Sequence, residues 1–185
     1  MVQAAASEEK SCCAAPTETK DANYVRTLAQ YQVPDVTLVT QEGERVSLSQ
    51  LLDTDRPVLL DFVFTTCTTI CPVLTAGFAD LQRQLGPQAE DVLMVSVSID
   101  PEHDTPEVML EYLQRFEAGP NWTFLTGNRA DIEKTMRAFD AYVANKMSHL
   151  PLTFLKAPGA EKWVRIHGLI STADFMKEFQ QLAQN

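Results

Sequence analysis

Two of the four cysteines stand close together at a junction between two predicted elements. Cys67 and Cys71 are separated by three residues, and Pro72 follows directly. A buried strand is predicted to end just before Cys67 and a helix to begin near Cys71. Backbone N–H groups and the helix dipole at such a start favour the thiolate, the reactive and metal-binding form of cysteine. The pair could share a soft metal ion or close a small disulfide ring on an exposed turn; the alternative is that both are buried small apolar residues.

The elements around these cysteines predict an α/β fold. The runs Val58–Phe64 and Val92–Ile99 are almost continuously apolar, which is typical of parallel strands buried on both faces. After Cys71, apolar residues recur at steps of four and three up to Leu85, which predicts an amphipathic helix. Further strands are expected at 122–125, 152–155 and 163–166, and further helices begin near 104–105, 128 and 171. This order predicts a thioredoxin-like mixed sheet flanked by helices.

The N-terminal part divides into two predicted regions. Residues 1–23 are rich in Ala, Ser, Thr, Glu and Lys without apolar periodicity, so we expect a flexible N-terminal tail. The segments Val36–Val39 and Arg45–Ser47 flank Gln-Glu-Gly and predict a β-hairpin extension, followed by a short helix at Leu48–Leu52. Residues 24–185 are expected to form one domain.

Composition excludes several classes of protein. The chain has 185 residues, of which 45% are apolar, enough for a sizeable core. Its net charge of -10 and isoelectric point near 4.7 would repel a phosphate backbone, so we exclude nucleic acid as the main partner. The longest apolar runs are far shorter than the ~20 residues of a membrane-spanning helix. We therefore expect this chain to be soluble, with a native membrane anchor possible outside it.

Three segments together resemble the Sco/SenC copper chaperones of cytochrome oxidase assembly. They are the strand Leu-Leu-Asp-Phe-Val-Phe leading into Cys67-x3-Cys71-Pro72, the segment Val97–Glu107, and His149 five residues before Phe154. The resemblance covers about Tyr24 to Gln181. It implies a thioredoxin-like copper-binding domain at 24–185.

The resemblance also implies a function and a ligand set. Cys67 and Cys71 would bind Cu(I), and His149 would complete a site for Cu(II), so copper is the expected cofactor. The implied partner is a cuproprotein such as cytochrome c oxidase subunit II with its CuA centre, besides another copper chaperone or a thiol reductase. The implied location is periplasmic or otherwise extracytoplasmic, with membrane tethering. Thr68 and Ser148 replace the Pro and Asp common in the family, which bears on affinity and redox potential more than on ligand identity.

Other candidate residues have structural alternatives. Asp61 lies six residues before Cys67 in the buried strand, where it could hold charge or pass protons beneath the cysteines, or be hydrogen-bonded near the sheet edge. Asp100 ends the next strand and could support the site or only begin a turn. His103 and His167 are expected on the surface.

Two further features are hypotheses at this stage. The vicinal Cys12–Cys13 pair in the predicted tail could capture copper or exchange disulfides with Cys67 and Cys71, or be passive. The Leu150–Pro151 bond could be cis, as before the facing strand in many thioredoxin-like folds, although cis X–Pro bonds are only ~5–6% of the total.

The chemistry leaves two functions open. One is copper binding and transfer; the other is thiol–disulfide reduction with Cys67 and Cys71 as catalytic residues, which needs no metal. His149 discriminates between them, because only copper binding requires it. A peroxiredoxin-like peroxidase fits poorly, since no Arg lies near Cys67 in the sequence.

Overall fold

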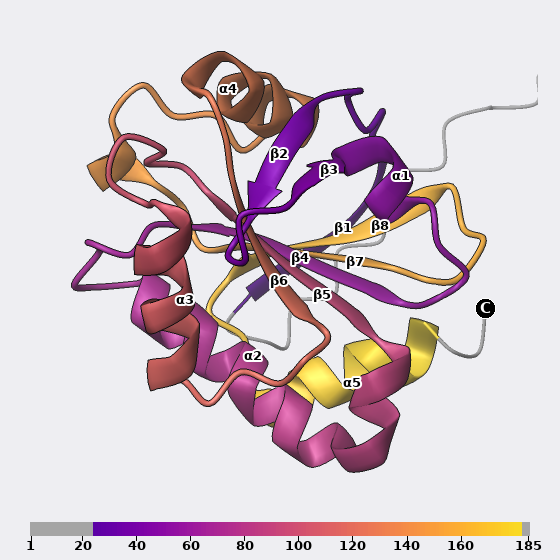
Figure 1. Ribbon diagram of the computed structural model, residues 1–185. Helices are drawn as coiled ribbons and strands as arrows, with labels where there is room; N and C mark the ends of the chain where they lie inside the picture. The colour runs from indigo at the N-terminus through magenta and orange to yellow at the C-terminus, as the bar shows by residue number, and fades with distance from the viewer. Residues whose placement is uncertain (1–23, 183–185) are drawn as a thin grey trace, which may run out of the picture.

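The computed structural model describes residues 24–182 and contains one eight-stranded sheet (Figure 1). The strands stand in the order β1-β8-β7-β4-β5-β6-β2-β3. They are β1 (Tyr24–Gln30), β2 (Thr37–Thr40), β3 (Arg45–Ser47), β4 (Val58–Val63), β5 (Leu93–Ser98), β6 (Trp122–Thr126), β7 (Leu152–Lys156) and β8 (Lys162–Gly168). The helices are α1 (Leu48–Leu52), α2 (Cys71–Leu85), α3 (Pro106–Arg115), α4 (Arg129–Ala138) and α5 (Thr172–Leu182), with 3₁₀ turns η1 (Gly86–Asp91) and η2 (Lys146–Ser148).

The centre of the sheet is parallel. β4 pairs with β5, and β5 pairs with β6, in the same direction. Every residue of β4 and β5 is buried, which explains why these strands are read as continuous apolar runs. β7 joins the other side of β4 in the antiparallel direction and forms a hairpin with β8. The predicted mixed sheet is therefore confirmed.

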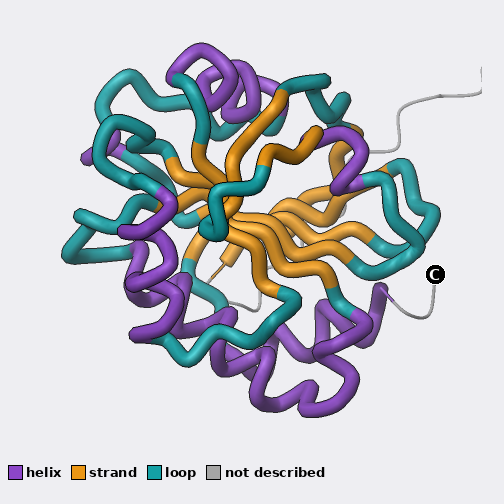
Figure 2. Tube along the Cα trace, in the orientation of Figure 1, coloured by secondary structure: helices purple, strands orange, loops and turns teal. Residues whose placement is uncertain are grey.

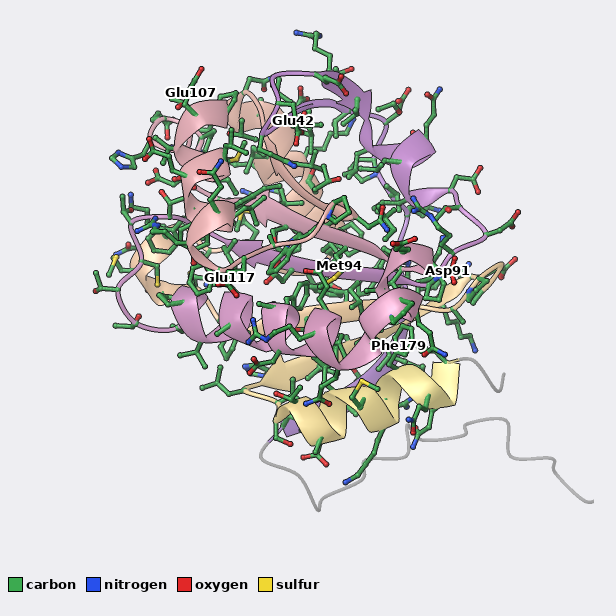
Figure 3. All side chains as sticks on the ribbon, turned by 60° about the horizontal axis from the view of Figure 1, so that its bottom comes forward. Glu42, Asp91, Met94, Glu107, Glu117 and Phe179 are labelled. Carbon is green, nitrogen blue, oxygen red and sulfur yellow. The ribbon has the colours of Figure 1, made fainter. Side chains whose placement is uncertain are left out.

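Helices cover both faces of the sheet. Figures 1 and 2 show α2, α3 and α5 on one face and α4 on the other. On the first face, the rings of Phe78 in α2 and Phe175 in α5 lie 5.6 Å apart. On the second, Phe139 at the end of α4 packs on Phe62 of β4 at 5.9 Å. In Figure 3, Met94 lies in the interior of the molecule, and it has no exposed surface. The ring contacts on the two faces show that each side of the sheet has its own packed layer.

The N-terminal region confirms one prediction and adds a strand. β2 and β3 form the expected antiparallel hairpin, which extends the sheet beyond β6. β1 was not predicted; it pairs antiparallel with β8, Tyr24 opposite Gly168, at the other sheet edge. Its sequence lacks apolar alternation, and Val25 and Leu28 remain 49% and 57% exposed. The predicted flexible tail at residues 1–23 lies outside the described residues.

One edge of the sheet collects the chemically interesting segments. Asp61 of β4 pairs with Thr153 of the antiparallel β7, so the segments that follow β4 and precede β7 meet at one edge. The first segment carries Cys67 and Cys71, and the second carries His149. Both lie at the left-hand edge of the sheet in Figure 1. Antiparallel pairing thus joins residues that are about eighty positions apart in the chain.

The Leu150–Pro151 peptide bond is trans, so the cis hypothesis is wrong. Within residues 24–182, no helix combines the length and the apolar character needed to cross a membrane.

Candidate metal centre

The loop between β4 and α2 places both cysteines at the start of the helix. The Cys67 N–H donates to the Phe64 carbonyl at 3.2 Å, which closes a turn directly after the strand. Cys71 is the first residue of α2, and its N–H donates to the Cys67 sulfur at 3.4 Å. Ile70, the N-cap residue, provides no side-chain hydrogen bond. The Cys67 sulfur therefore takes the role of a capping acceptor for one of the free N–H groups at the helix start.

The two thiols differ strongly in acidity. Burial opposes ionisation of Cys67, but hydrogen bonds from the Cys71 N–H and from Thr69 outweigh it and lower the pKa of Cys67 to about 7. Burial raises the pKa of Cys71 far above its usual range, and the neighbouring Cys67 adds to the rise. At neutral pH, Cys67 is therefore partly a thiolate while Cys71 stays protonated. Nucleophilic attack and first contact with a soft metal ion fall to Cys67.

Neither cysteine is on the exposed turn that the sequence predicted. Cys67 is 6% exposed and Cys71 is fully buried, and both are free thiols. The Thr75 hydroxyl of α2 bonds to the Cys71 carbonyl at 2.9 Å and lies 3.0 Å from the Tyr112 hydroxyl of α3. These contacts hold the first turn of α2 inside the structure. The expectation of exposure is wrong, while the position at the strand-to-helix junction is confirmed.

His149 lies against the second cysteine. It directly follows η2, and its Nδ1 atom is 4.0 Å from the Cys71 sulfur. The side chain is buried, its ring stands edge-on to Phe64 at 6.4 Å, and Nε2 has no hydrogen bond of normal geometry. Burial lowers the pKa of His149 to about 4, so the imidazole is neutral at neutral pH. A neutral ring offers a lone pair to a metal ion.

The distance between Cys71 and His149 suits a shared ion. With about 2.3 Å to sulfur and about 2.0 Å to nitrogen, as in zinc sites, one ion would separate the two donor atoms by about 3.5 Å in tetrahedral and about 4.3 Å in linear geometry. The observed 4.0 Å lies between these limits. In the described part of the chain, no three His, Cys, Asp or Glu side chains are yet gathered closely enough to hold a metal. The structure thus brings Cys71 to both Cys67 and His149 without closing a three-ligand set.

The turn that carries His149 is fastened to the end of β5. Lys146 of η2 forms an ion pair with Asp100, whose side chain is 7% exposed. The Lys146 ammonium also lies 5.3 Å from the centre of the Phe64 ring. Asp100 therefore supports the site indirectly, which was one of the two interpretations offered by the sequence.

Asp61 is buried in the sheet, and no cation pairs with it in the described part of the chain. Neither carboxyl oxygen makes a hydrogen bond of normal geometry, and the residue has no exposed surface. Burial raises its pKa to about 7, an effect that the Ser96 hydroxyl opposes only in part. Side chains alternate along a strand, so Asp61 points to the face opposite Phe62, toward the α2 layer. The alternative that Asp61 lies near the sheet edge is wrong, because β4 is a central strand.

A residue that sequence reasoning did not assign to the site is Asp104. Its carboxylate accepts hydrogen bonds from the Thr65 hydroxyl and the Ser98 hydroxyl, both at 2.5 Å, and lies 3.3 Å from the Thr65 N–H through each oxygen. The sequence indicates only a helix cap here, and Thr105 is the residue that caps α3. The available signal was the pair of serines inside the apolar run of β5, since polar residues in a buried strand need partners.

The remaining predicted candidates do not join the site. His103 and His167 are exposed, as expected. Cys12 and Cys13 lie outside the described residues. A cavity of about 330 Å³ lies beside Asp100 and Lys146, and neither cysteine nor His149 lines it.

Comparison with known proteins shows which family the chain belongs to. The family model described as SCO1/SenC matches residues 26–180, which include the whole loop between β4 and α2 and the turn with His149. The chain belongs to the SCO1/SenC family. The resemblance noted from the sequence is thereby confirmed.

Individual members of the SCO1/SenC family agree with this assignment. The chain is 39% identical over 116 residues to a SCO1 protein homolog from Bacillus subtilis, an alignment that covers 61% of this chain and 59% of that relative. The chain thus spans little more than half of this curated relative's length.

Two solved SCO1/SenC structures are similar in fold. One is BsSco, a member of the Sco family of cytochrome c oxidase assembly proteins in which a disulfide switch was identified; it shares 31% identity, with a TM-score of 0.69 over 84% of this chain and 95% of that one. The other is Bradyrhizobium japonicum ScoI with copper bound, at 28% identity and a TM-score of 0.58 over 70% and 82%. The fold is thioredoxin-like, as predicted.

Proposed function

We propose that this protein is a copper chaperone that binds Cu(I) and Cu(II) through Cys67, Cys71 and His149. The observation that carries the proposal is that Cys71 lies beside both Cys67 and a histidine from a distant segment, with His149 Nδ1 at 4.0 Å from the Cys71 sulfur. Thiolate and imidazole are the donors that copper favours among protein side chains. The copper-bound ScoI structure is a second, independent support.

The acidity of the donors determines how copper would bind. Cys67 is half ionised near neutral pH, whereas Cys71 must lose its proton when the ion arrives. Two thiolates satisfy Cu(I), whereas Cu(II) prefers four donors and draws on the neutral imidazole of His149. With only three protein donors, the site stays open to a fourth from the target, which favours transfer over storage.

The proposed destination is the CuA centre of cytochrome c oxidase subunit II or a related cuproprotein. BsSco is a member of a family of cytochrome c oxidase assembly proteins, which supports this class of partner. A periplasmic or otherwise extracytoplasmic location follows from that partner, and a lipoprotein of the same family from Bacillus anthracis is consistent with membrane tethering. We propose residues 24–185 as the copper-binding domain, with another copper chaperone or a thiol reductase as a further partner.

A histidine pair in the chain offers a matched test. His149→Ala should weaken Cu(II) binding by far more than tenfold and change the visible spectrum, while Cu(I) affinity stays within about tenfold, or 1.4 kcal/mol. His167→Ala removes an exposed imidazole from β8 and should leave Cu(I) and Cu(II) binding and the spectrum unchanged. Cys67→Ser or Cys71→Ser should abolish binding of both ions. Wild-type Cu(II) affinity and spectrum in His149→Ala would refute the ligand set.

The alternative function is reduction of a disulfide in the apo-target, favoured by the unequal acidity of the two thiols. The Cys67 thiolate would attack the target disulfide and form a mixed disulfide, releasing one target thiolate. Cys71 would then lose its proton and attack Cys67, forming the Cys67–Cys71 disulfide and releasing the second target thiol. The disulfide switch of BsSco supports this chemistry. This alternative would be favoured if His149→Ala still reduced a target peptide and the wild-type protein bound no copper.

A further inference from the structure

Asp104 is a buried carboxylate without a cation. It has no exposed surface, and its bonds go to the hydroxyls of Thr65 and Ser98 and to the Thr65 N–H. A buried acidic group costs free energy unless hydrogen bonds replace its hydration, and these three donors do so. The carboxylate therefore connects three separate segments: the end of β5, the loop before α3, and the loop that leads to the cysteines.

The contact with Thr65 is the informative one. Thr65 is the first residue of the turn that the Cys67 N–H closes onto the Phe64 carbonyl at 3.2 Å. Asp104 holds both the backbone N–H and the hydroxyl of Thr65, so the orientation of this peptide is fixed at two points. Ser98, in contrast, lies in a central strand whose ladder already holds it in place.

We propose that Asp104 is a positioning residue for the Cys67 thiol, because its carboxylate holds Thr65 and thereby fixes the turn that places the Cys67 sulfur at the start of α2. In this position the Cys67 sulfur accepts a hydrogen bond from the Cys71 N–H at 3.4 Å. The inference rests on the proposed role of Cys67 as the reactive thiol. It adds a third segment to the site, beyond the two that carry the cysteines and the histidine.

The direction in which the pKa of Cys67 changes distinguishes a positioning role of Asp104 from a purely electrostatic one. Cys71 on α2 and Tyr112 on α3 interact electrostatically with Cys67, while Asp61 on β4 and His149 before β7 lie close to Cys71. None of them changes when Asp104 or Thr65 is replaced. Removal of a nearby negative charge would by itself make the Cys67 thiol more acidic. Loss of the position at the helix start would instead make it less acidic, which is what the proposal requires.

The test follows alkylation of Cys67 in the metal-free, reduced full chain. The rate is measured against pH with iodoacetamide, and peptide mass spectrometry distinguishes Cys67 from the other cysteines. The midpoint of the profile reports thiolate stability, whereas the plateau at high pH reports access, so a loosened loop is not mistaken for a more acidic thiol. Asp104→Asn and Thr65→Val should move the midpoint upward, by up to about 1.5 pH units toward an ordinary cysteine. Thr65→Ser restores the hydroxyl and should return the midpoint to the wild-type value.

Ser98→Ala is the matched control. It removes one hydrogen bond from the same carboxylate, together with the acceptor of the Asp100 N–H, but leaves the contact with Thr65. It should therefore lower the unfolding midpoint in urea while the alkylation midpoint stays within about 0.3 of wild type. If Asp104→Asn does not fold, Thr65→Val and Thr65→Ser still decide the question. An unchanged or lowered midpoint in Thr65→Val would overturn the proposal. Because no copper is used, that result would leave the proposed copper chemistry intact.

Discussion

Replacing Asp61 by asparagine should change how the stability of the protein depends on pH. Asp61 is fully buried, and its pKa rises from the ordinary 3.8 to about 7 because burial disfavours the charge. Between these two values, the folded chain keeps a proton that the unfolded chain releases. The folded state therefore binds more protons, and the free energy of unfolding must fall as pH rises through this window.

The size of the effect follows from the difference in pKa. At 1.36 kcal/mol per pKa unit, the shift corresponds to about 4 kcal/mol in all, of which about 3 kcal/mol of stability is lost between pH 4 and pH 7. Asparagine has nearly the same shape and no charge to bury, so Asp61→Asn should lack this loss. Relative to wild type, the variant should gain several kcal/mol of stability at pH 7 compared with pH 4.

His149 acts in the opposite direction over nearly the same range. Burial lowers its pKa from 6.5 to about 4, so the unfolded chain binds a proton in this window that the folded chain does not. Stability therefore rises by about 3 kcal/mol as pH increases from 4 to 6.5. The two contributions largely cancel in wild type. In Asp61→Asn the free energy of unfolding should therefore rise with pH over this range, and in His149→Ala it should fall.

Urea unfolding under reducing conditions measures these curves. Trp122 and Trp163 are buried, so their fluorescence reports unfolding at each pH from 4 to 8. Asp80→Asn on the exposed side of α2 serves as a control that should run parallel to wild type. If the difference between Asp61→Asn and wild type is independent of pH, Asp61 is already ionised in the folded protein and the reasoning about its burial is wrong.

Three other predictions concern the turn that carries His149 and the N-terminal segment. Lys146→Met removes the ion pair with Asp100 and should loosen η2, so the titration midpoint of His149 in NMR spectra should move from about 4 toward 6.5; a constant midpoint would show that the pair does not hold the turn. Deleting residues 1–22 should change the thermal midpoint by less than about 4 °C, because the sheet begins at Tyr24 and the deleted segment has no apolar stripe; a larger drop would show that it packs on the domain. If Cys12–Cys13 captures copper, the full chain should bind more Cu(I) than this deletion variant, and equal stoichiometry would make the pair passive.

Local pattern in the sequence was sufficient for most of the architecture. The apolar runs of β4 and β5 and the helical stripe of α2 depend on residues that are neighbours in the chain, so periodicity predicted them with nearly correct ends. The placement of Cys67 and Cys71 at a strand-to-helix junction follows from the same local pattern. His149, in contrast, was assigned by resemblance to a family, because a loop histidine has no periodicity to identify it.

What only the tertiary structure decided depends on contacts between distant segments. β1 exists because β8 offers an edge to pair with, and its own half-exposed sequence contains no such information. The cysteines are buried in the folded chain, and their unequal acidity follows from that burial and from the hydrogen bonds that the Cys71 N–H and Thr69 make to the Cys67 sulfur. The carboxylate of Asp104 reaches a threonine 39 positions earlier in the chain. Burial, pKa and hydrogen-bond partners are set by neighbours in space, and the order of residues alone does not specify which neighbours those are.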